Sequence, residues 1–570
     1  MDKRTILAIV LSTLIFIVFL ILNSLLSPPK KNQTQPSENV TKTVEAEVVN
    51  SVVKAVPEDK PLSETILAPI LTKYLRVIFT NRGAVPVSIK INDIEKDPAN
   101  SSLEDDIEMV YPQDPQAQGL IEGEYPFTLS FGTYKTRPTI DLFYFNVLSE
   151  TKVEFYRDFE IDGKIVKIKK TFEVIPDSYH LKLTVQLENT ERDYLPFDFG
   201  GVLYTLGIGP QIGPAFNGNI PDERSDYRRF VILVDKNRNE FNQPWGAKPR
   251  LESGIFKWAA ITGKYYAIIT STNATIKNVV LDSRELGKPF LRSAMYFERQ
   301  RQLTQALTDE YTFYVGPKKR EVLTAYQDKN YYELAPIVFP FGTIAEILRY
   351  PLDFFSKIGN YGVAIILLTI LIKILLFPLS RKSFDSMRKM QALNPKLQEL
   401  REKYKNDPKR LNLEMAELYK REGVSPLGGC LPQLLQLPIL FGLYVLFNEH
   451  FALKNAVFIP GWINDLSVAE SVFHLPFTIP IVNISDIRLL PIIMLITQLI
   501  ATFFTQTQTS GGDKRMQYLP YILMAVFFFI LYNLPSGLVL YWTVQNILTV
   551  LQTLIQKFFS ERRLRQALVR

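Results

Sequence analysis

One apolar run decides the fold: Tyr361-Gly-Val-Ala-Ile-Ile-Leu-Leu-Thr-Ile-Leu-Ile-Lys-Ile-Leu-Leu-Phe-Pro378. Its length is that of a helix that crosses a bilayer. About twelve Val, Ile, Leu and Phe residues, at about −0.3 to −0.6 kcal/mol each, outweigh a cost of about +3 kcal/mol for one central lysine. Thr369 and Lys373 are four residues apart and share a face of this helix. The run therefore predicts a transmembrane helix with one polar face.

Five other apolar runs have the composition of transmembrane helices. The N-terminal run, residues 6–26, is longer than the core of a secretory signal, and no Ala-x-Ala cleavage site follows it. We therefore expect residues 1–27 to form an uncleaved anchor. The remaining runs predict helices at residues 427–448, 489–506, 517–534 and 536–559. The chain is thus expected to be a membrane α-helical protein with six transmembrane helices.

The distribution of positive charge predicts how these helices are oriented. Residues 381–425 carry twelve Lys and Arg, whereas residues 449–486 carry one Lys and no Arg. Positively charged loops stay in the cytoplasm. We expect the loop at 381–425, the loop at 511–515, the basic tail at 561–570 and both termini to be cytoplasmic. The loop at 449–487 is then periplasmic, in the inner membrane of a bacterial cell.

Residues 28–335 read as soluble protein. Residues 28–62 are rich in Pro, Ser, Thr, Asn, Lys and Glu and contain no aromatic residue, which predicts a flexible linker. Residues 63–335 alternate with a period of two, and turn signals such as Asn81-Arg-Gly83 separate the alternating runs. This pattern predicts a large periplasmic β-sandwich domain. Its clearest strands are expected at residues 75–80, 164–172, 180–187 and 266–272.

Two segments beside the run at 361–378 have helical periodicity without being apolar enough to span a membrane. Residues 336–359 predict an amphipathic helix in the membrane interface, kinked at Pro351. Residues 381–425 predict a helical hairpin, whose second helix is capped by Asp407 before Pro408 and ends at Gly423. The hairpin is either a solvated element or a docking surface.

The predicted transmembrane helices also carry polar residues at helical spacing. Lys373 has no Asp or Glu within these spans to neutralise it, so it either lies in a hydrated cavity or extends to the cytoplasmic headgroups. The amide and hydroxyl groups, taken singly, favour hydrogen bonds between helices. Their positions are Gln433 and Gln436, then Gln498 and Thr502, then Tyr541, Gln545 and Thr549 with Asn546 beside them.

Motifs of chemical catalysis are absent from the sequence. Cys430 is the one cysteine, which excludes an intramolecular disulfide and a Cys-based metal site. The three histidines, His180, His450 and His474, have no metal-ligand spacing, and there is no P-loop, nucleophile elbow or HExxH motif. We therefore expect no cofactor, no metal, and no enzymatic activity.

Several motifs resemble those of the YidC/Oxa/Alb family of membrane insertases. They occur in order between about residues 340 and 560, and the N-terminal anchor with its β domain is similar to the Gram-negative form of that family. The motifs are Pro426-Leu-Gly-Gly-Cys-Leu-Pro-Gln-Leu-Leu-Gln-Leu-Pro438, Trp462-Ile-Asn-Asp-Leu-Ser467, Leu534-Pro-Ser-Gly-Leu-Val-Leu-Tyr-Trp542, and the run at 361–378 with Phe377-Pro378-Leu379.

The resemblance implies a five-helix insertase core, residues 360–560, that encloses a hydrophilic, positively charged groove for the substrate. Lys373 stands where most members have Arg, so the charge is kept while the planar fork is lost. The resemblance places Thr369, Gln436, Tyr541 and Trp542 at groove or substrate-contact positions. Gln433 and Gln545 belong to the same polar faces, and we include them among the expected groove residues.

The implied function is to insert integral membrane proteins into the bacterial inner membrane and to help them fold, alone or with the Sec translocon. The implied partners are nascent membrane proteins, the Sec translocon, the lipid bilayer, and, through the basic loops and tail, the ribosome. A small-solute transporter is the main alternative, but it would usually have repeated halves and broken helices. An intramembrane enzyme would need a nucleophile with a base, or a carboxylate pair, within the spans.

Overall fold

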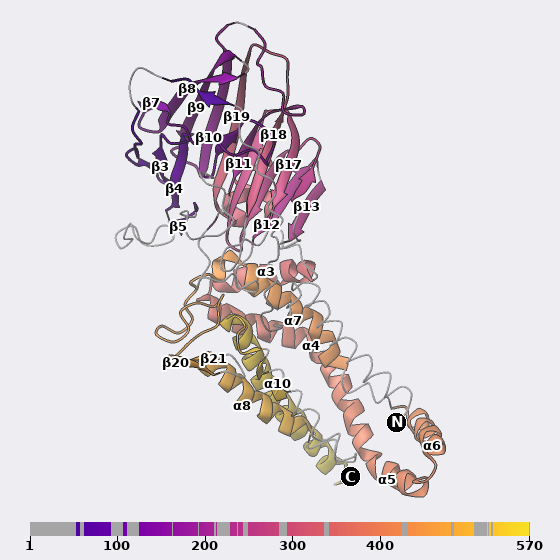
Figure 1. Ribbon diagram of the computed structural model, residues 1–570. Helices are drawn as coiled ribbons and strands as arrows, with labels where there is room; N and C mark the ends of the chain where they lie inside the picture. Colours follow the sequence, from indigo (N-terminus) through magenta and orange to yellow (C-terminus); the bar gives the residue numbers. More distant parts are fainter. Residues whose placement is uncertain are drawn as a thin grey trace. The chain divides into compact units, whose positions relative to one another are not determined.

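The computed structural model describes part of the chain, in two compact units, Lys30–Ala335 and Pro336–Arg570 (Figure 1). The residues described are 53–57, 62–92, 107–110, 125–161, 163–191, 193–209, 213, 228–235, 237–242, 249–283, 293–335, 341–424, 431–479, 484–506, 521, 524–525, 528–529 and 531–568.

The first unit consists of three antiparallel sheets and a short helical end. The ten-stranded sheet has the order β1 (Lys54–Ala55), β8 (Lys152–Ile161), β9 (Lys164–Val174), β10 (His180–Asn189), β19 (Ala306–Pro317), β16 (Tyr266–Thr272), β15 (Trp258–Thr262), β12 (Arg229–Val234) and β13 (Asn237–Asn242), with β7 (Tyr144–Ser149) also on β8. The five-stranded sheet has the order β14 (Arg250–Glu252), β17 (Ile276–Asp282), β18 (Ala294–Gln300), β11 (Val202–Ile208) and β6 (Thr128–Ser130). The four-stranded sheet has the order β2 (Ile70–Leu71), β3 (Leu75–Thr80), β4 (Val85–Ile91) and β5 (Ile107–Glu108). The helical end comprises α2 (Arg320–Thr324), η2 (Gln327–Lys329) and η3 (Tyr331–Leu334).

Aromatic side chains pack the smaller sheets against the ten-stranded one. Phe297 of β18 lies 6.4 Å, ring centre to ring centre, from Tyr311 of β19. Phe79 of β3 lies 5.0 Å from Phe172 of β9. These rings project inward because alternate residues of a strand face the same side. The four strands predicted from period-two patterns are confirmed as β3, β9, β10 and β16.

The linker expected at residues 28–62 contains a strand near its end, so the prediction is wrong there. Lys54 and Ala55 pair with β8, and Val56 N donates to Asp158 O at 3.0 Å. Backbone groups along β8 are satisfied by this extended segment. Composition describes side chains and so does not reveal such pairing. Residues 28–52 lie outside the described part of the chain.

The second unit is mainly helical. Its elements are α3 (Gly342–Ser356), α4 (Tyr361–Ala392), α5 (Asn394–Lys403), α6 (Pro408–Arg421), α7 (Leu431–Glu449), η5 (Phe451–Leu453), β20 (Phe473–Ile479), β21 (Ile484–Ile487), α8 (Leu489–Gln506) and α10 (Ser536–Leu568).

Two helices of the described residues are long and apolar enough to cross a membrane, Tyr361–Ser386 within α4 and Ser536–Phe558 within α10. Shorter apolar helices are Leu435–Glu449 and Leu489–Phe504. The expected anchor at 1–27 and most of the helix expected at 517–534 lie outside the described residues. The count of six transmembrane helices therefore stays a prediction.

Two helices continue past the ends predicted for their spans. The α4 helix runs through Pro378 to Ala392, and α10 runs past residue 559 to Leu568. Hydrophobicity marks where a helix can lie in lipid. It does not mark where the helix ends, because Lys, Arg, Gln and Glu are good helix formers. The first helical arm expected in the hairpin is therefore divided between the end of α4 and α5.

The hairpin itself follows the sequence pattern. Asp407 caps α6, its Oδ1 accepting from Arg410 N at 3.1 Å, and Gly423 after the helix has a φ of 62°. Both features confirm the predicted boundaries of the second helix. A small apolar cluster joins the arms and consists of Leu393, Leu397, Leu418 and Val424.

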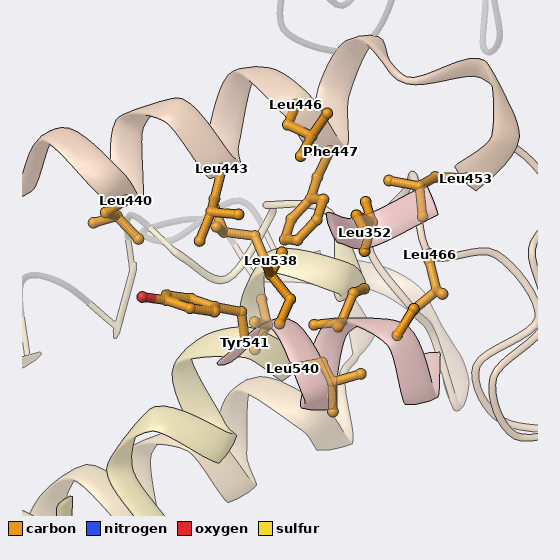
Figure 2. Close-up of a cluster of buried hydrophobic side chains, with 14 of the residues drawn as sticks. Leu352, Leu440, Leu443, Leu446, Phe447, Leu453, Leu466, Leu538, Leu540 and Tyr541 are labelled. Carbon is orange, nitrogen blue, oxygen red and sulfur yellow. The ribbon is translucent and has the colours of Figure 1, made fainter. Parts of the chain in front are cut away.

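The core of the helical unit is a leucine-rich cluster between α3, α4, α7 and α10 (Figure 2). In it α3 and α7 cross at Gly442, where an added Cβ would lie 2.6 Å from Ile344 Cγ2. A glycine lets the two helices approach this closely. The crossing holds α3 against the unit by its buried face, on which Ala345 and Leu352 are fully covered. Pro351 lies within this continuous helix.

Candidate functional site

Lys373 joins α4 to α10. Its Nζ donates to Thr549 Oγ1 at 2.8 Å, and the Thr549 hydroxyl donates to the backbone oxygen of Gln545 at 2.7 Å. Both side chains are half-buried. Within the described part of the chain, no carboxylate lies within ion-pair distance of the ammonium, so a neutral hydroxyl is its partner. A cation without a counterion keeps most of its capacity to attract an anion.

Amide and phenol groups connect α7 with α10 on the same side. Gln545 Nε2 donates to Gln436 Oε1 at 3.2 Å, and Gln436 Nε2 donates to Tyr541 Oη at 3.5 Å. Tyr541 is fully buried, and its ring belongs to the leucine-rich cluster, as Figure 2 shows. Among the described residues Gln545 Oε1 has no donor. The Tyr541, Gln545 and Thr549 stripe predicted from helical spacing thus faces α4 and α7.

Trp542 faces a different helix from its neighbour Tyr541. Its Nε1 donates to Gln498 Oε1 of α8 at 2.9 Å. One turn further on, Asn546 Nδ2 donates to Thr497 Oγ1 at 3.3 Å. Consecutive helical residues point about 100° apart, so Tyr541 and Trp542 lie on two faces of α10. The expected Tyr541–Trp542 pair is therefore divided between two helix contacts.

The other expected site residues make no side-chain contact between helices that the structure describes. The Thr369 hydroxyl is fully buried and donates to Ile365 O of its own helix at 2.6 Å. This bond satisfies the hydroxyl within α4. Gln433 lies in the first turn of α7, and its side chain is outside the described part of the structure.

Charged residues tie α3 to the end of α7. Asp353 accepts from Arg349 Nη1 at 2.9 Å and lies 2.7 Å from His450 Nε2. Tyr361 Oη at the start of α4 lies 3.4 Å from the same carboxylate. Burial raises the pKa of Asp353, but the hydrogen bond and charge of His450, together with Arg349, hold it below its ordinary value. Three elements therefore meet at one carboxylate.

A second junction lies where α8 and α10 begin. We call residues Trp462–Glu470 the cap loop. Glu470 is 6% exposed and accepts from Trp462 Nε1 at 3.2 Å and from Leu490 N at 2.8 Å. Ser536 Oγ donates to Asp465 O at 2.7 Å. The cap loop thus contacts the first turns of both helices.

Sequence reasoning identified the polar faces and missed Glu470. A single Glu in a polar loop resembles any solvated residue, and β20 and β21 lie between Glu470 and the start of α8, so no local signal marks it as a cap. Gln498 was visible as a polar residue of an apolar span. Its contact with Trp542 could not be anticipated, because it depends on which helices are neighbours.

The arrangement suits binding rather than covalent chemistry. It offers one ammonium, two amides and a phenol between apolar helices. Among the described residues no group of His, Cys, Asp and Glu could hold a metal ion. Polar groups at this position can form hydrogen bonds with a polar segment that lies beside an apolar one.

Comparison with known proteins identifies relatives over nearly the whole chain. The family model described as "60Kd inner membrane protein" matches residues 353–562. "Membrane protein insertase YidC" of Treponema denticola is 34% identical over 591 residues, covering 97% of this chain and 99% of the relative. The protein of that name from Treponema pallidum is 29% identical over 632 residues, covering 98% and 99%.

One solved structure is similar over most of the chain. It is described as "Active YidC insertase crystal structure with the first transmembrane domain resolved". The match covers 88% of this chain and 94% of that chain, with 19% identity and a TM-score of 0.34.

Proposed function

Because the chain belongs to the YidC family of membrane protein insertases, we propose that it inserts proteins through a polar groove lined by Lys373 and Gln436. The family is one of inner membrane proteins, and insertases move polypeptide segments without covalent catalysis. The observation that carries the groove is the Lys373 ammonium, which has a hydroxyl partner and no carboxylate partner among the described residues, beside the Gln436, Tyr541 and Gln545 network. The proposed groove residues are Lys373, Thr369, Gln433, Gln436, Tyr541, Trp542 and Gln545.

The mechanism follows from the solvation of polar groups. A polar flank costs free energy when it crosses hydrocarbon, and hydrogen-bonding groups part-way across shorten the apolar distance. Lys373 lowers this cost for acidic flanks. The hydrophobic segment of the substrate then moves into lipid, and its burial, at about 0.8 kcal/mol per CH₂ group, supplies the free energy. No nucleotide is needed for this step.

The topology belongs to the same proposal. Six transmembrane helices place both termini in the cytoplasm and the β-sheet unit in the periplasm, with a linker between the anchor and β1. The interfacial segment at 336–359 precedes the core at 360–560. The exposed apolar side of α3 supports its place in the interface, since Ile347, Tyr350 and Phe354 are each more than 60% exposed.

Partners follow from these surfaces. Nascent membrane proteins and the lipid bilayer are implied by the family. We propose in addition that the chain works alone or with the Sec translocon. The α5–α6 hairpin and the tail would contact the ribosome weakly, because both are rich in Lys and Arg and RNA is an anion.

Site-specific photo-crosslinking in growing cells tests the function. A photoreactive residue replaces Gln436 or Trp542, and the matched control replaces Leu413, which is 66% exposed on α6 in the hairpin. We expect nascent membrane proteins to crosslink at the first two positions and not at Leu413. Absence of polypeptide products at both Gln436 and Trp542 would favour a small-solute transporter.

A further inference from the structure

Glu470 has both carboxylate oxygens committed to donors from different elements. One oxygen accepts from the indole of Trp462 at 3.2 Å, and the other accepts from Leu490 N at 2.8 Å in the first turn of α8. The first N–H groups of a helix have no partner within the helix, and its dipole favours a negative group there. Glu470 therefore caps α8 and fastens that helix to the cap loop.

The same loop holds the start of α10. Ser536 N donates to Val468 O at 2.8 Å, and Gly537 N donates to Leu466 O at 3.0 Å. The Ser536 hydroxyl lies 2.7 Å from Asp465 O and 2.8 Å from Val468 O. The first two residues of α10 thus donate three hydrogen bonds, which are accepted by the backbone carbonyl groups of Asp465, Leu466 and Val468.

Both helices are therefore fastened within the six residues Asp465–Glu470. Because an α-helix rises about 1.5 Å per residue, Gln498 lies about 12 Å along α8 from Leu490. Trp542 lies about 8 Å along α10 from Gly537. The Trp542–Gln498 bond of 2.9 Å and the Asn546–Thr497 bond of 3.3 Å form only at one axial register. A slide by one helical turn, about 5.4 Å, would break both.

We propose that Glu470 is a positioning residue that sets the axial register of α8 on α10, and that insertion depends on this register. The first half, that Glu470 sets the register, rests only on the hydrogen bonds described above. The second half rests on the proposed function, because α10 carries Tyr541 and Gln545 on its other face and Trp542 toward α8.

The carboxylate suits this role better than an amide does. Trp462 and Leu490 both present N–H groups, so both oxygens must accept. An amide at position 470 would offer one oxygen and turn an N–H group toward one of these donors. The substitution Glu470→Gln keeps the shape of the side chain while it removes one of the two bonds.

The experiment measures the register directly in the full-length, membrane-embedded protein. Cys430 is replaced by Ser, so that Thr497→Cys and Asn546→Cys introduce the two thiols of the chain. A short bifunctional thiol reagent then crosslinks α8 to α10. Glu470→Ala, Glu470→Gln and Trp462→Phe are introduced into this parent. Glu321→Ala is the matched control, because its carboxylate is exposed and lies in the other unit.

We expect Glu470→Ala to slow crosslinking about tenfold, as loss of a hydrogen bond to a charged group implies. Glu470→Gln and Trp462→Phe should slow it less, and Glu321→Ala should leave the parent rate. If Glu470→Ala does not accumulate in the membrane, the crosslinking rate of Glu470→Gln is the test. If Glu470→Ala crosslinks at the same rate as the parent, the positioning role is overturned. Where Glu470→Ala does not accumulate, the same result with Glu470→Gln overturns it.

Insertion of a single-span substrate is measured in the same cells. We expect it to fall in the same order as the crosslinking rate. Slowed crosslinking with unchanged insertion overturns the second half of the proposal. If the unsubstituted protein inserts nothing, while crosslinking in the cysteine variants follows the expected order, the proposed function is contradicted and the role of Glu470 stays in place.

Discussion

The ammonium of Lys373 on α4 lies 2.8 Å from the hydroxyl of Thr549 on α10, 176 residues further along the chain. Thr549 gives its one hydroxyl proton to the backbone oxygen of Gln545, so toward Lys373 it can act only as an acceptor. The contact orients the lysine, and no carboxylate among the residues that the structure describes neutralises its charge. It is therefore compatible with a cation that attracts an acidic segment.

Substitution of Lys373 should discriminate between substrates. Lys373→Ala is expected to reduce insertion of a single-span substrate with an acidic translocated flank about tenfold, because a charge-assisted contact is lost. A substrate with a neutral flank should be affected much less. Lys373→Arg should be tolerated and Lys373→Glu should be worst. Protease protection of the flank at matched expression is the measurement.

The contrary outcome is equally specific. If Lys373 only extended to the headgroups, removing an intramembrane cation would not impair the helix. Equal insertion of both substrates by Lys373→Ala and the parent would remove the groove role. Thr549→Ser, which keeps the accepting hydroxyl, serves as the control.

The two amides should be energetically coupled. Gln436→Leu leaves the buried amide of Gln545 without this partner, and Gln545→Leu does the same to the half-buried amide of Gln436, at a cost of about 1–3 kcal/mol in unfolding free energy. The double variant should cost less than the sum by about 1 kcal/mol. Gln498 pairs with Trp542 on another face, so Gln498→Leu with Gln436→Leu should be additive within about 0.5 kcal/mol. Denaturation in detergent measures the free energy of unfolding of each variant. If the effects of Gln436→Leu and Gln545→Leu were additive, the contact between the two amides would be contradicted.

Labelling of single cysteines should report the topology. In a Cys430→Ser background, cysteines at residues 150, 300 and 465 should react with a membrane-impermeant reagent in intact cells. Cysteines at residues 400, 512 and 565 should react only after the membrane is opened. The asymmetry of Lys and Arg between residues 381–425 and 449–486 is the reason. Protection of residues 150 and 300 in intact cells would rule out the six-helix arrangement.

The α3–α7 crossing should not tolerate a methyl group. In Gly442→Ala the new Cβ meets Ile344 Cγ2 at 2.6 Å, so α3 must shift, at a cost of about 1–3 kcal/mol. Gly359→Ala is the control, because its Cβ would lie 3.5 Å from Val363 Cβ. Ile344→Ala in the Gly442→Ala background should relieve part of this clash, because the nearest remaining atom is Cβ of residue 344 at 3.0 Å. The rate of limited proteolysis near α3 measures the change, and equal rates for Gly442→Ala and Gly359→Ala would contradict it.

Lys170 should make the stability of the β-sheet unit depend on pH. It is fully buried, it donates to Phe127 O at 2.8 Å and Gly83 O at 3.1 Å, and burial lowers its pKa well below 10.5. Between the folded and unfolded pKa values the unfolded lysine binds more protons, so stability rises with pH by up to about 1.4 kcal/mol per unit. That contribution is complete above pH 10.5 and is lost as pH falls toward the folded pKa.

Replacement by an apolar side chain of similar length isolates this contribution. Lys170→Met cannot titrate, so the difference in unfolding free energy between parent and variant should change with pH. Pulse proteolysis of the full-length protein in denaturant, near neutral pH and about two units higher, measures that difference. A constant difference would show that Lys170 keeps its charge in the folded state.

Elements whose pattern is local could be predicted from the amino-acid sequence. Strands such as β9 and β10 follow from alternation, because successive side chains of a strand face opposite sides. The polar stripe of Tyr541, Gln545 and Thr549 follows from helical spacing. The cap at Asp407 follows from the chemistry of one side chain and the next three N–H groups.

The partners of these residues depend on how the helices and loops pack against one another. Thr549 as the acceptor for Lys373, Gln498 as the acceptor for Trp542, and Glu470 as the cap of α8 all join segments that are distant in sequence. Periodicity states which residues share a face, but it does not state which helix lies opposite. A hydrogen bond forms over about 3 Å and only between groups that packing has brought together. Packing therefore decides these contacts.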